Sequence, residues 1–324
     1  MLPYLVLGLV LALAPASGEP LIQGSLSKDL DYLHEYFQKQ VLPKWRDEPH
    51  VIADHPARRF CYLPGKDVFV TGAPEVRVEP GSIRMEVQLG RRIIQVARDV
   101  QGPAVVVVPG VSYYKVMALA GQYVCEVGEV ILAGRPPRFA AVLKRDDQVI
   151  AREDLGELFL ADVEYWVYSD RVVMRVLGFR PEGGWSRYRE GEPLAITVTF
   201  DLGGGRILVD RVKVTDAALV ERMRELSRSL EGPVLGSVLR TGSGVEPLFV
   251  DFEPREGDPL VRFIERVFGM YEQGASEEEL REVMSEHPNV EFLFPEKGGG
   301  TTSGIPVWVL PLLPVPLAGR RDDA

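Results

Sequence analysis

Apolar and polar side chains alternate over much of the stretch between residues 67 and 155. The alternation is strict over residues 83–89, and residues 105–108 form a short, continuous apolar run. A period of two is typical of strands that bury one face, and an apolar run between turns is typical of a strand buried on both faces. We therefore predict a β-rich domain over residues 67–155, built as an antiparallel sandwich or a small barrel.

The next segment, residues 156–232, has the same pattern and then changes period. Residues 159–179 and 195–214 each predict a hairpin, and three consecutive glycines close the second one. The glycines are not followed by a Lys-Ser/Thr pair, so a turn explains them better than a phosphate-binding loop. A helix follows, with Thr215 or Asp216 as its cap. This segment is predicted to be a second β-rich unit that ends in a helix.

Helices are also predicted near both ends of the chain. In the N-terminal segment, residues 19–66, apolar side chains recur at helical spacing over residues 25–42, and Pro43 ends the pattern. In residues 233–297 a strand, two helices and a strand follow one another, and Asp258 can cap the first of the two helices. The predicted fold class is α+β and β-rich: antiparallel β-sandwich or small-barrel modules, an N-terminal helix and a C-terminal β-α-α-β unit.

The first eighteen residues have the layout of a signal peptide. An apolar stretch at residues 5–13 is followed by small residues that suit cleavage, although no Lys or Arg precedes it. The alternatives are a membrane anchor and a buried N-terminal strand. The stretch is short for a membrane span, and Pro15 follows it. We expect residues 1–18 to be removed and the mature chain, without a membrane span, to be periplasmic or extracellular.

Composition restricts the partners more than the fold. The net charge is −10, and the longest basic runs are pairs of arginines. A field of this sign repels nucleic acid, so we expect no nucleic-acid partner. Asn289 is the only asparagine, and Arg outnumbers Lys by 29 to 8. This bias fits a thermophilic protein, in which asparagines would deamidate, or a GC-rich genome.

The chain contains two cysteines, Cys61 and Cys125. In an oxidising compartment they could form a disulfide that closes a loop of roughly 65 residues and adds about 4 kcal/mol of stability. The alternative is a pair of unconnected buried thiols. Neither cysteine lies in a C-x-x-C motif, so we expect no redox centre or cysteine-rich zinc site.

Two groups of polar residues could carry chemistry. His50, Asp54 and His55 are the densest set of possible metal ligands, but prolines flank them and solvated loop residues are the simpler interpretation. Asp251 and Glu253 lie two apart at the end of a predicted strand, where paired carboxylates could act as general acid and base. A charged strand end is the simpler interpretation here. We expect no cofactor.

Aromatic residues are the remaining candidates for binding. Trp166, Trp185 and Tyr188 lie close in sequence within the second β-rich unit, where they could contact a sugar or a protein partner, or fill a β core. Trp308 lies in the C-terminal segment, residues 298–324, a glycine-rich linker followed by an apolar, proline-rich tail. The prolines prevent a continuous helix, so the tail either docks on a partner or folds back on the chain.

These features predict a non-catalytic binding or assembly protein of the cell envelope or the extracellular space. Its partner would be another envelope protein or a surface polymer. The alternative is a secreted hydrolase that uses the paired carboxylates Asp251 and Glu253.

Overall fold

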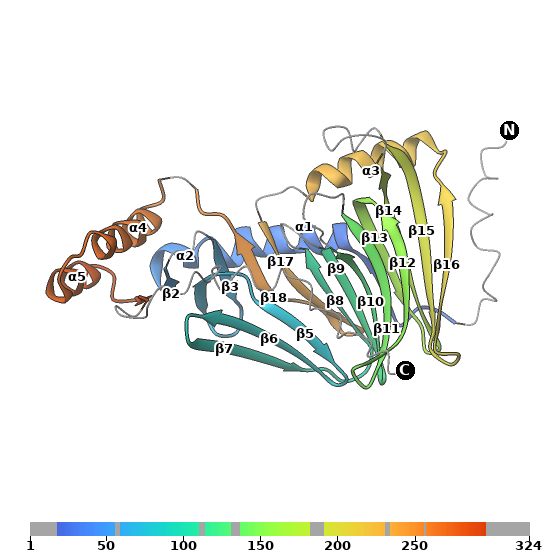
Figure 1. The fold of residues 1–324 in the computed structure, drawn as a ribbon, viewed down its shortest axis with the longest axis horizontal. Coiled ribbons are helices and arrows are strands. Elements are labelled where there is room, and N and C mark those ends of the chain that lie inside the picture. Colours follow the sequence, from blue (N-terminus) through green and yellow to red (C-terminus); the bar gives the residue numbers. More distant parts are fainter. Residues whose placement is uncertain are drawn as a thin grey trace, which may run out of the picture.

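The fold was determined as a computed structural model, which describes residues 18–55, 59–109, 114–130, 137–181, 191–230, 234–255 and 257–295 (Figure 1). Three β-sheets form the body of the molecule, and helices cover parts of two of them. We call the sheets the outer, the central and the small sheet.

The outer sheet is antiparallel throughout and contains five strands. Their order is β1 (Ile22–Ser25), β13 (Phe159–Val167), β14 (Arg171–Arg180), β15 (Glu192–Asp201) and β16 (Arg206–Lys213). The two hairpins predicted in residues 156–232 therefore form most of this sheet, and the N-terminal strand β1 extends it by pairing with β13.

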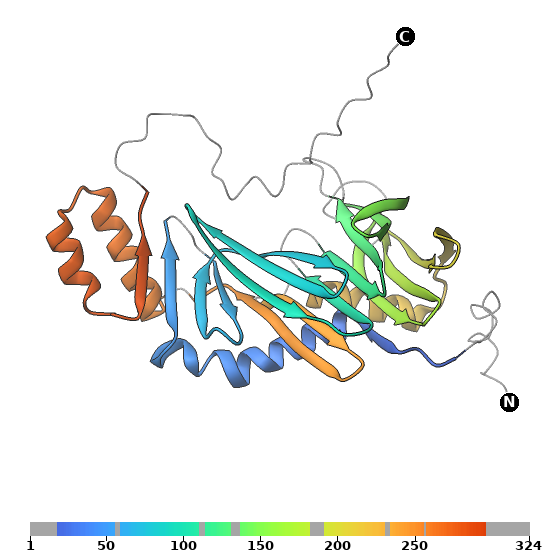
Figure 2. The same cartoon turned by 90° about the horizontal axis from the view of Figure 1, so that it is seen from below.

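The central sheet contains eleven strands and runs along most of the molecule (Figure 2). Their order is β12 (Gln148–Glu157), β11 (Arg138–Arg145), β10 (Tyr123–Val130), β9 (Tyr114–Ala120), β8 (Ala104–Pro109), β17 (Val234–Thr241), β18 (Gly244–Phe252), β3 (Phe60–Leu63), β4 (Val68–Thr71), β2 (His50–Asp54) and β19 (Val290–Leu293). The β4–β2 and β2–β19 pairs are parallel, and the other pairs are antiparallel.

The small sheet is a three-stranded meander that covers one face of the central sheet. It consists of β5 (Glu75–Glu79), β6 (Ser82–Leu89) and β7 (Arg92–Asp99). Alternating residues of β6, such as Ile83 and Met85, are buried against β3, β8 and β9, whereas Arg84 is exposed. The period-two pattern of residues 83–89 thus marks a strand with one buried face, as predicted.

The helices occupy the other face of the central sheet and one end of the outer sheet (Figure 1). They are α1 (Leu26–Tyr36), its π-helical continuation η1 (Phe37–Val41), α2 (Lys44–Asp47), α3 (Ala217–Ser229), α4 (Pro259–Glu272) and α5 (Glu277–Met284). Among the described residues, no helix combines the length and the apolar character needed to cross a bilayer.

The core is layered. On one face of β8–β12 apolar residues such as Val107 and Phe139 meet those of the outer sheet, such as Val176 and Phe200. The same face continues toward β2–β4 and β18, where α1, α2, α4 and α5 replace the outer sheet as the cover. Helix α1 joins the two regions, because Leu26 packs in the first and Leu33 in the second.

The predicted fold class is confirmed: the molecule is α+β and β-rich, with an N-terminal helix and with β18, α4, α5 and β19 at its C-terminal end. The central sheet takes strands from three of the predicted segments, residues 19–66, 67–155 and 233–297. A local pattern of alternation identifies strands but not their neighbours, because pairing is set by packing between distant segments.

Candidate functional site

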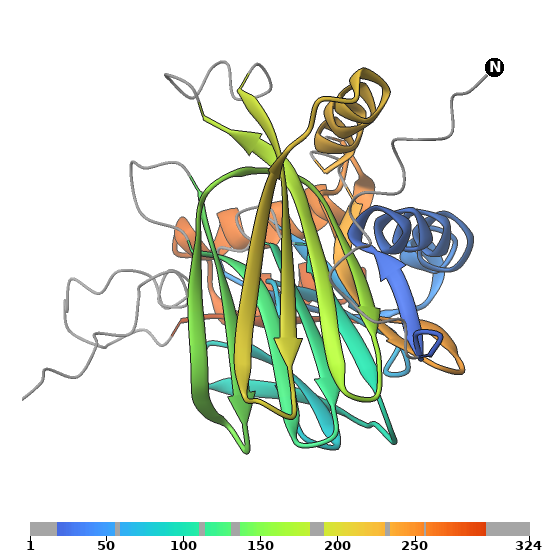
Figure 3. The ribbon, with the colours of Figure 1, turned by 90° about the vertical axis from the view of Figure 1, so that its right-hand side faces the viewer.

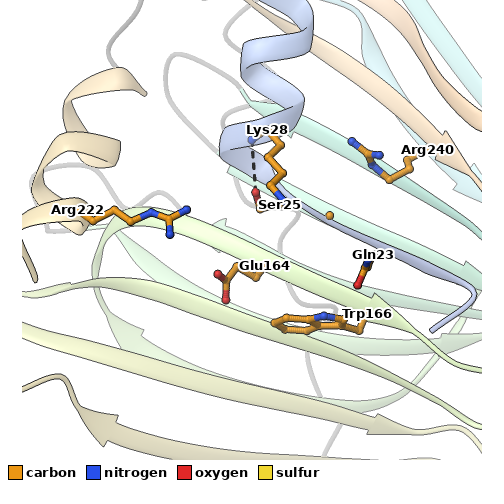
Figure 4. A pocket seen from close by; sticks show the side chains of 8 residues that line it. Gln23, Ser25, Lys28, Glu164, Trp166, Arg222 and Arg240 are labelled. Atoms are coloured by element: carbon orange, nitrogen blue, oxygen red, sulfur yellow. Dashed lines mark hydrogen bonds between the residues drawn. The ribbon is translucent and has the colours of Figure 1, made fainter. Parts of the chain in front are cut away.

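A pocket of about 390 Å³ opens where the N-terminal strand and helix meet the outer sheet (Figure 4). Its volume lies within the roughly 300–1,000 Å³ that is usual for small-molecule sites. It is lined by Gln23, Gly24 and Ser25 of β1, Lys28 of α1, Glu164 and Trp166 of β13, Arg222 of α3 and Arg240 of β17. Four separate parts of the chain therefore build it.

Arg240, one of the residues that line this pocket, belongs to a buried polar network. Tyr165 Oη donates to Asp29 Oδ2 (2.6 Å) and accepts from Arg240 Nε (2.9 Å), while Arg240 Nη2 pairs with Asp29 Oδ1. Asp29 and Tyr165 are both inaccessible to solvent. Burial raises the pKa of Asp29, and its contacts with Tyr165 and Arg240 oppose this shift. The network ties α1, the outer sheet and the central sheet together at one point.

Gly24 lets this network approach the pocket surface. A Cβ atom at position 24 would overlap the hydroxyl group of Tyr165 and lie 2.9 Å from Arg240 Nε. Only glycine leaves that space free, so the residue is required by a close approach of side chains to the backbone of β1.

The N-terminus of α1 is held by a protein carboxylate. Ser27 donates to Asp162 of β13 through its backbone N–H (3.0 Å) and its hydroxyl group (2.8 Å), and Ser25 caps the helix by accepting from the N–H of Lys28. Asp162 is buried, which raises its pKa. The carboxylate of Asp162 thus occupies the position at the N-terminus of α1 where an anion would bind. A ligand would therefore contact the side chains of the pocket and not the backbone N–H groups of the helix.

The pocket carries excess positive charge. Arg240 is paired with Asp29, and Glu164 is paired with Arg175, which also lies over the ring of Trp166 at 5.7 Å. Lys28 and Arg222 are exposed, and no carboxylate of the described residues forms an ion pair with either of them. Figure 4 shows both side chains directed into the space beside Glu164 and Trp166. Two cations that form no ion pair within the described residues, in a chain of net charge −10, favour an anionic ligand.

Trp166 supplies the apolar part of the pocket. Its side chain is half-buried on the outward face of β13, and Gln23 lies opposite it on β1. An indole ring beside cationic groups can hold a flat ring that bears a negative charge. The pocket therefore suits binding. Glu164, the one carboxylate among the described residues that line it, is held by Arg175.

The candidate binding residues have different outcomes. Trp166 is one of the residues that line the pocket, and its role in binding stays a prediction. Its neighbour Tyr165 fills the core. Trp185, Tyr188 and Trp308 lie outside the described residues, as does the C-terminal tail.

Asp251 and Glu253 differ in environment. Asp251 lies in β18 with its side chain only 5% exposed, paired with Arg59 and opposite Cys61. Burial is the main cause that raises the pKa of Asp251 to about 6, and the negative charge of Glu253 adds to it. Glu253 follows the end of β18 and is exposed. The two carboxylates lie near each other, as the hydrolase hypothesis requires, but one of them is enclosed by protein.

His50 and Asp54 form the two ends of strand β2, so the predicted loop is wrong for these two residues, whereas His55 lies in a turn that follows the strand. The segment becomes a strand because β4 and β19 flank it on both sides. His50 Nε2 lies 3.2 Å from Glu291 and His55 Nε2 lies 2.6 Å from Glu272. Within the described ranges no three His, Cys, Asp or Glu side chains are grouped as metal ligands.

The disulfide alternative for Cys61 and Cys125 is also wrong, because both are free, buried thiols. Cys61 lies in β3 and faces the small sheet, whereas Cys125 lies in β10 and faces the outer sheet. Their strands are five positions apart in the central sheet, or roughly 24 Å, far beyond the reach of a disulfide. Sequence separation alone does not reveal that two cysteines lie on opposite faces.

The cations of the pocket were not among the residues predicted from sequence. Lys28, Arg222 and Arg240 lie in three segments whose proximity no local pattern indicates. Asp29 does leave a signal: it lies three residues after Leu26 and four before Leu33, within the apolar face of α1. A carboxylate on such a face predicts a buried partner of opposite charge.

No known protein family, no curated protein and no solved structure matches the chain.

Proposed function

We propose that the chain is an exported, non-catalytic binding protein of the cell envelope or the extracellular space, and that the pocket beside Trp166 is its binding site. One observation carries the binding role: Lys28 and Arg222, which form no ion pair within the described residues, converge on a half-buried indole ring. Export rests on the signal-peptide layout of residues 1–18. The ligand would carry a carboxylate, sulfate or phosphate group beside a ring.

Export has a direct test. Mass spectrometry of the protein from its native host should show a mature N-terminus near Ser17 or Glu19, because the small residues of the first segment suit signal peptidase. Recovery of the intact chain, with Met1, from the cytosolic fraction would contradict the proposal.

The binding role predicts affinity for simple anionic sugars. Glucuronate and glucose 6-phosphate should change the fluorescence of Trp166, and the affinity should fall with added salt because the attraction is between exposed charges. Replacing both Lys28 and Arg222 by glutamine should weaken binding about tenfold or more, since two charge-assisted hydrogen bonds are lost.

A matched control uses cations of the same two helical segments outside the pocket. Lys39→Gln with Arg228→Gln removes the same charge from η1 and α3 and should leave the affinity unchanged. Equal weakening by both pairs would mean that only net charge matters, and the pocket would lose its proposed role.

A further inference from the structure

The outer sheet has an open face that begins at the pocket. Successive strands place Gln23, Trp166, Val173, Thr199 and Leu208 opposite one another, in that order from β1 to β16. We call these five residues the outer row. Their inward-facing neighbours, such as Val172 and Phe200, are buried in the core. The outer row therefore faces away from the core and crosses the whole sheet.

Helix α3 covers a different part of this face. It packs on Ala161, Leu177 and Phe179, toward one end of the strands, whereas Trp166 lies near the opposite end of β13. Figure 3 shows the strands of the outer sheet upright and side by side, with α3 near their upper ends. Val173 and Thr199 are partly exposed, and Leu208 is 51% exposed. These side chains of the row are therefore accessible to solvent, at least in part.

The composition of the row suits an extended carbohydrate. Trp166 offers an aromatic ring, although Arg175 lies over it. Gln23 and Thr199 offer hydrogen-bonding groups, and Val173 and Leu208 are apolar but separated by Thr199. The positive charge lies at one end, in Lys28 and Arg222, which calls for an acidic group there.

We propose that this face binds one chain of an acidic polysaccharide, with an acidic sugar in the pocket and the following sugars along the outer row. The inference rests on the proposed binding function and specifies its ligand. The row spans four strand spacings, or roughly 19 Å, so it would contact several sugar residues and not one. Each added sugar contact should slow dissociation, because the pocket holds the end of the chain in place.

Chain length is the first test. Binding of oligogalacturonates with two and with six sugars should differ about tenfold or more in favour of the longer chain, beyond the statistical gain from repeated acidic groups. A neutral cello-oligosaccharide of six sugars lacks the charges for Lys28 and Arg222 and should bind much more weakly. A single-stranded oligothymidylate of similar charge should also bind more weakly. Equal affinity for it would overturn the carbohydrate proposal in favour of a general polyanion site.

Two matched variants locate the ligand. Leu208→Glu places a negative charge at the end of the row farthest from the pocket and should weaken only the six-sugar chain, about fivefold to tenfold. Val149→Glu makes a similar change at an exposed strand residue of the central sheet and should weaken neither chain. Circular dichroism and melting would show that both variants remain folded.

The outcomes separate the two proposals. If both oligomers bind alike and Leu208→Glu has no effect, the ligand is confined to the pocket and the outer row has no role, while the binding function stands. If neither oligomer nor the simple anionic sugars bind, the pocket function itself is wrong.

Discussion

Arg240→Met should lower the free energy of unfolding by about 3–5 kcal/mol near neutral pH, the usual cost of removing one partner of a buried ion pair. The substitution leaves Asp29 fully buried without its cation, and it removes one hydrogen bond from Tyr165. The loss should be smaller at acid pH. There Asp29 is protonated, and a neutral carboxyl group tolerates burial better than a charged one. Urea unfolding followed by fluorescence at several pH values measures both effects.

The same substitution at a neighbouring arginine is the control. Arg222→Met removes an exposed guanidinium group without an ion pair among the described residues and should change the free energy of unfolding by only about 0.5 kcal/mol. Asp29→Asn combined with Arg240→Met should recover part of the stability, because no charge is then left unpaired. A loss below about 1 kcal/mol for Arg240→Met would show that Asp29 reaches solvent or another partner.

Asp251→Asn should change how stability depends on pH. The pKa of Asp251 is about 6 in the folded chain and 3.8 in the reference state, so the folded state binds the proton more tightly. The stabilising effect of protonation is complete below pH 3.8 and is lost as the pH rises through 6. The difference between these two pKa values corresponds to roughly 3 kcal/mol in the free energy of unfolding. The difference in stability between variant and wild type should therefore move by about that amount in favour of the variant between pH 4 and pH 8.

The quantity to measure is the difference in the free energy of unfolding between variant and wild type, because another buried carboxyl group titrates in the same pH range. Burial raises the pKa of Glu129 to about 7, and this contribution is common to variant and wild type. Glu253→Gln is the control: Glu253 is exposed, so this variant should show a nearly constant difference from wild type. A constant difference for Asp251→Asn as well would mean that Asp251 is already ionised at pH 4. It would then be a simple partner of Arg59.

The Asp251→Asn variant also tests the hydrolase hypothesis. A catalytic acid needs a raised pKa and access to substrate, and Asp251 has the first of these. If Asp251→Asn removes an activity without the expected change in the pH profile, the enzyme hypothesis gains its first support. If it removes the pH dependence alone, Asp251 is a structural residue.

The strands and helices were predictable where apolar side chains recur on one face of the element. The alternation of residues 83–89 gave β6, and the apolar spacing after Ser25 gave α1, because each pattern needs only one buried face. The pocket was not predictable in this way. Lys28, Arg222 and Arg240 are ordinary charged residues in their own segments. They come together through the pairing of β1 with β13 and of β17 with β8, and through the packing of α3 on the outer sheet. Trp166 was found because aromatic residues are conspicuous in any sequence.

The order of strands in the central sheet constrains how the chain reaches its folded state. The β17–β18 hairpin lies between β8 and β3, and Ser237 donates to the carbonyl group of Val107 from 130 residues away. Until that hairpin has been synthesised and inserted, β8 and β3 each have one edge without its final neighbour. Such edges can pair with other chains, and contacts over long sequence distances form slowly. In a protein of this topology the central sheet can be completed only after the last third of the chain has been synthesised. Until then the unpaired edges of β8 and β3 must be protected from aggregation.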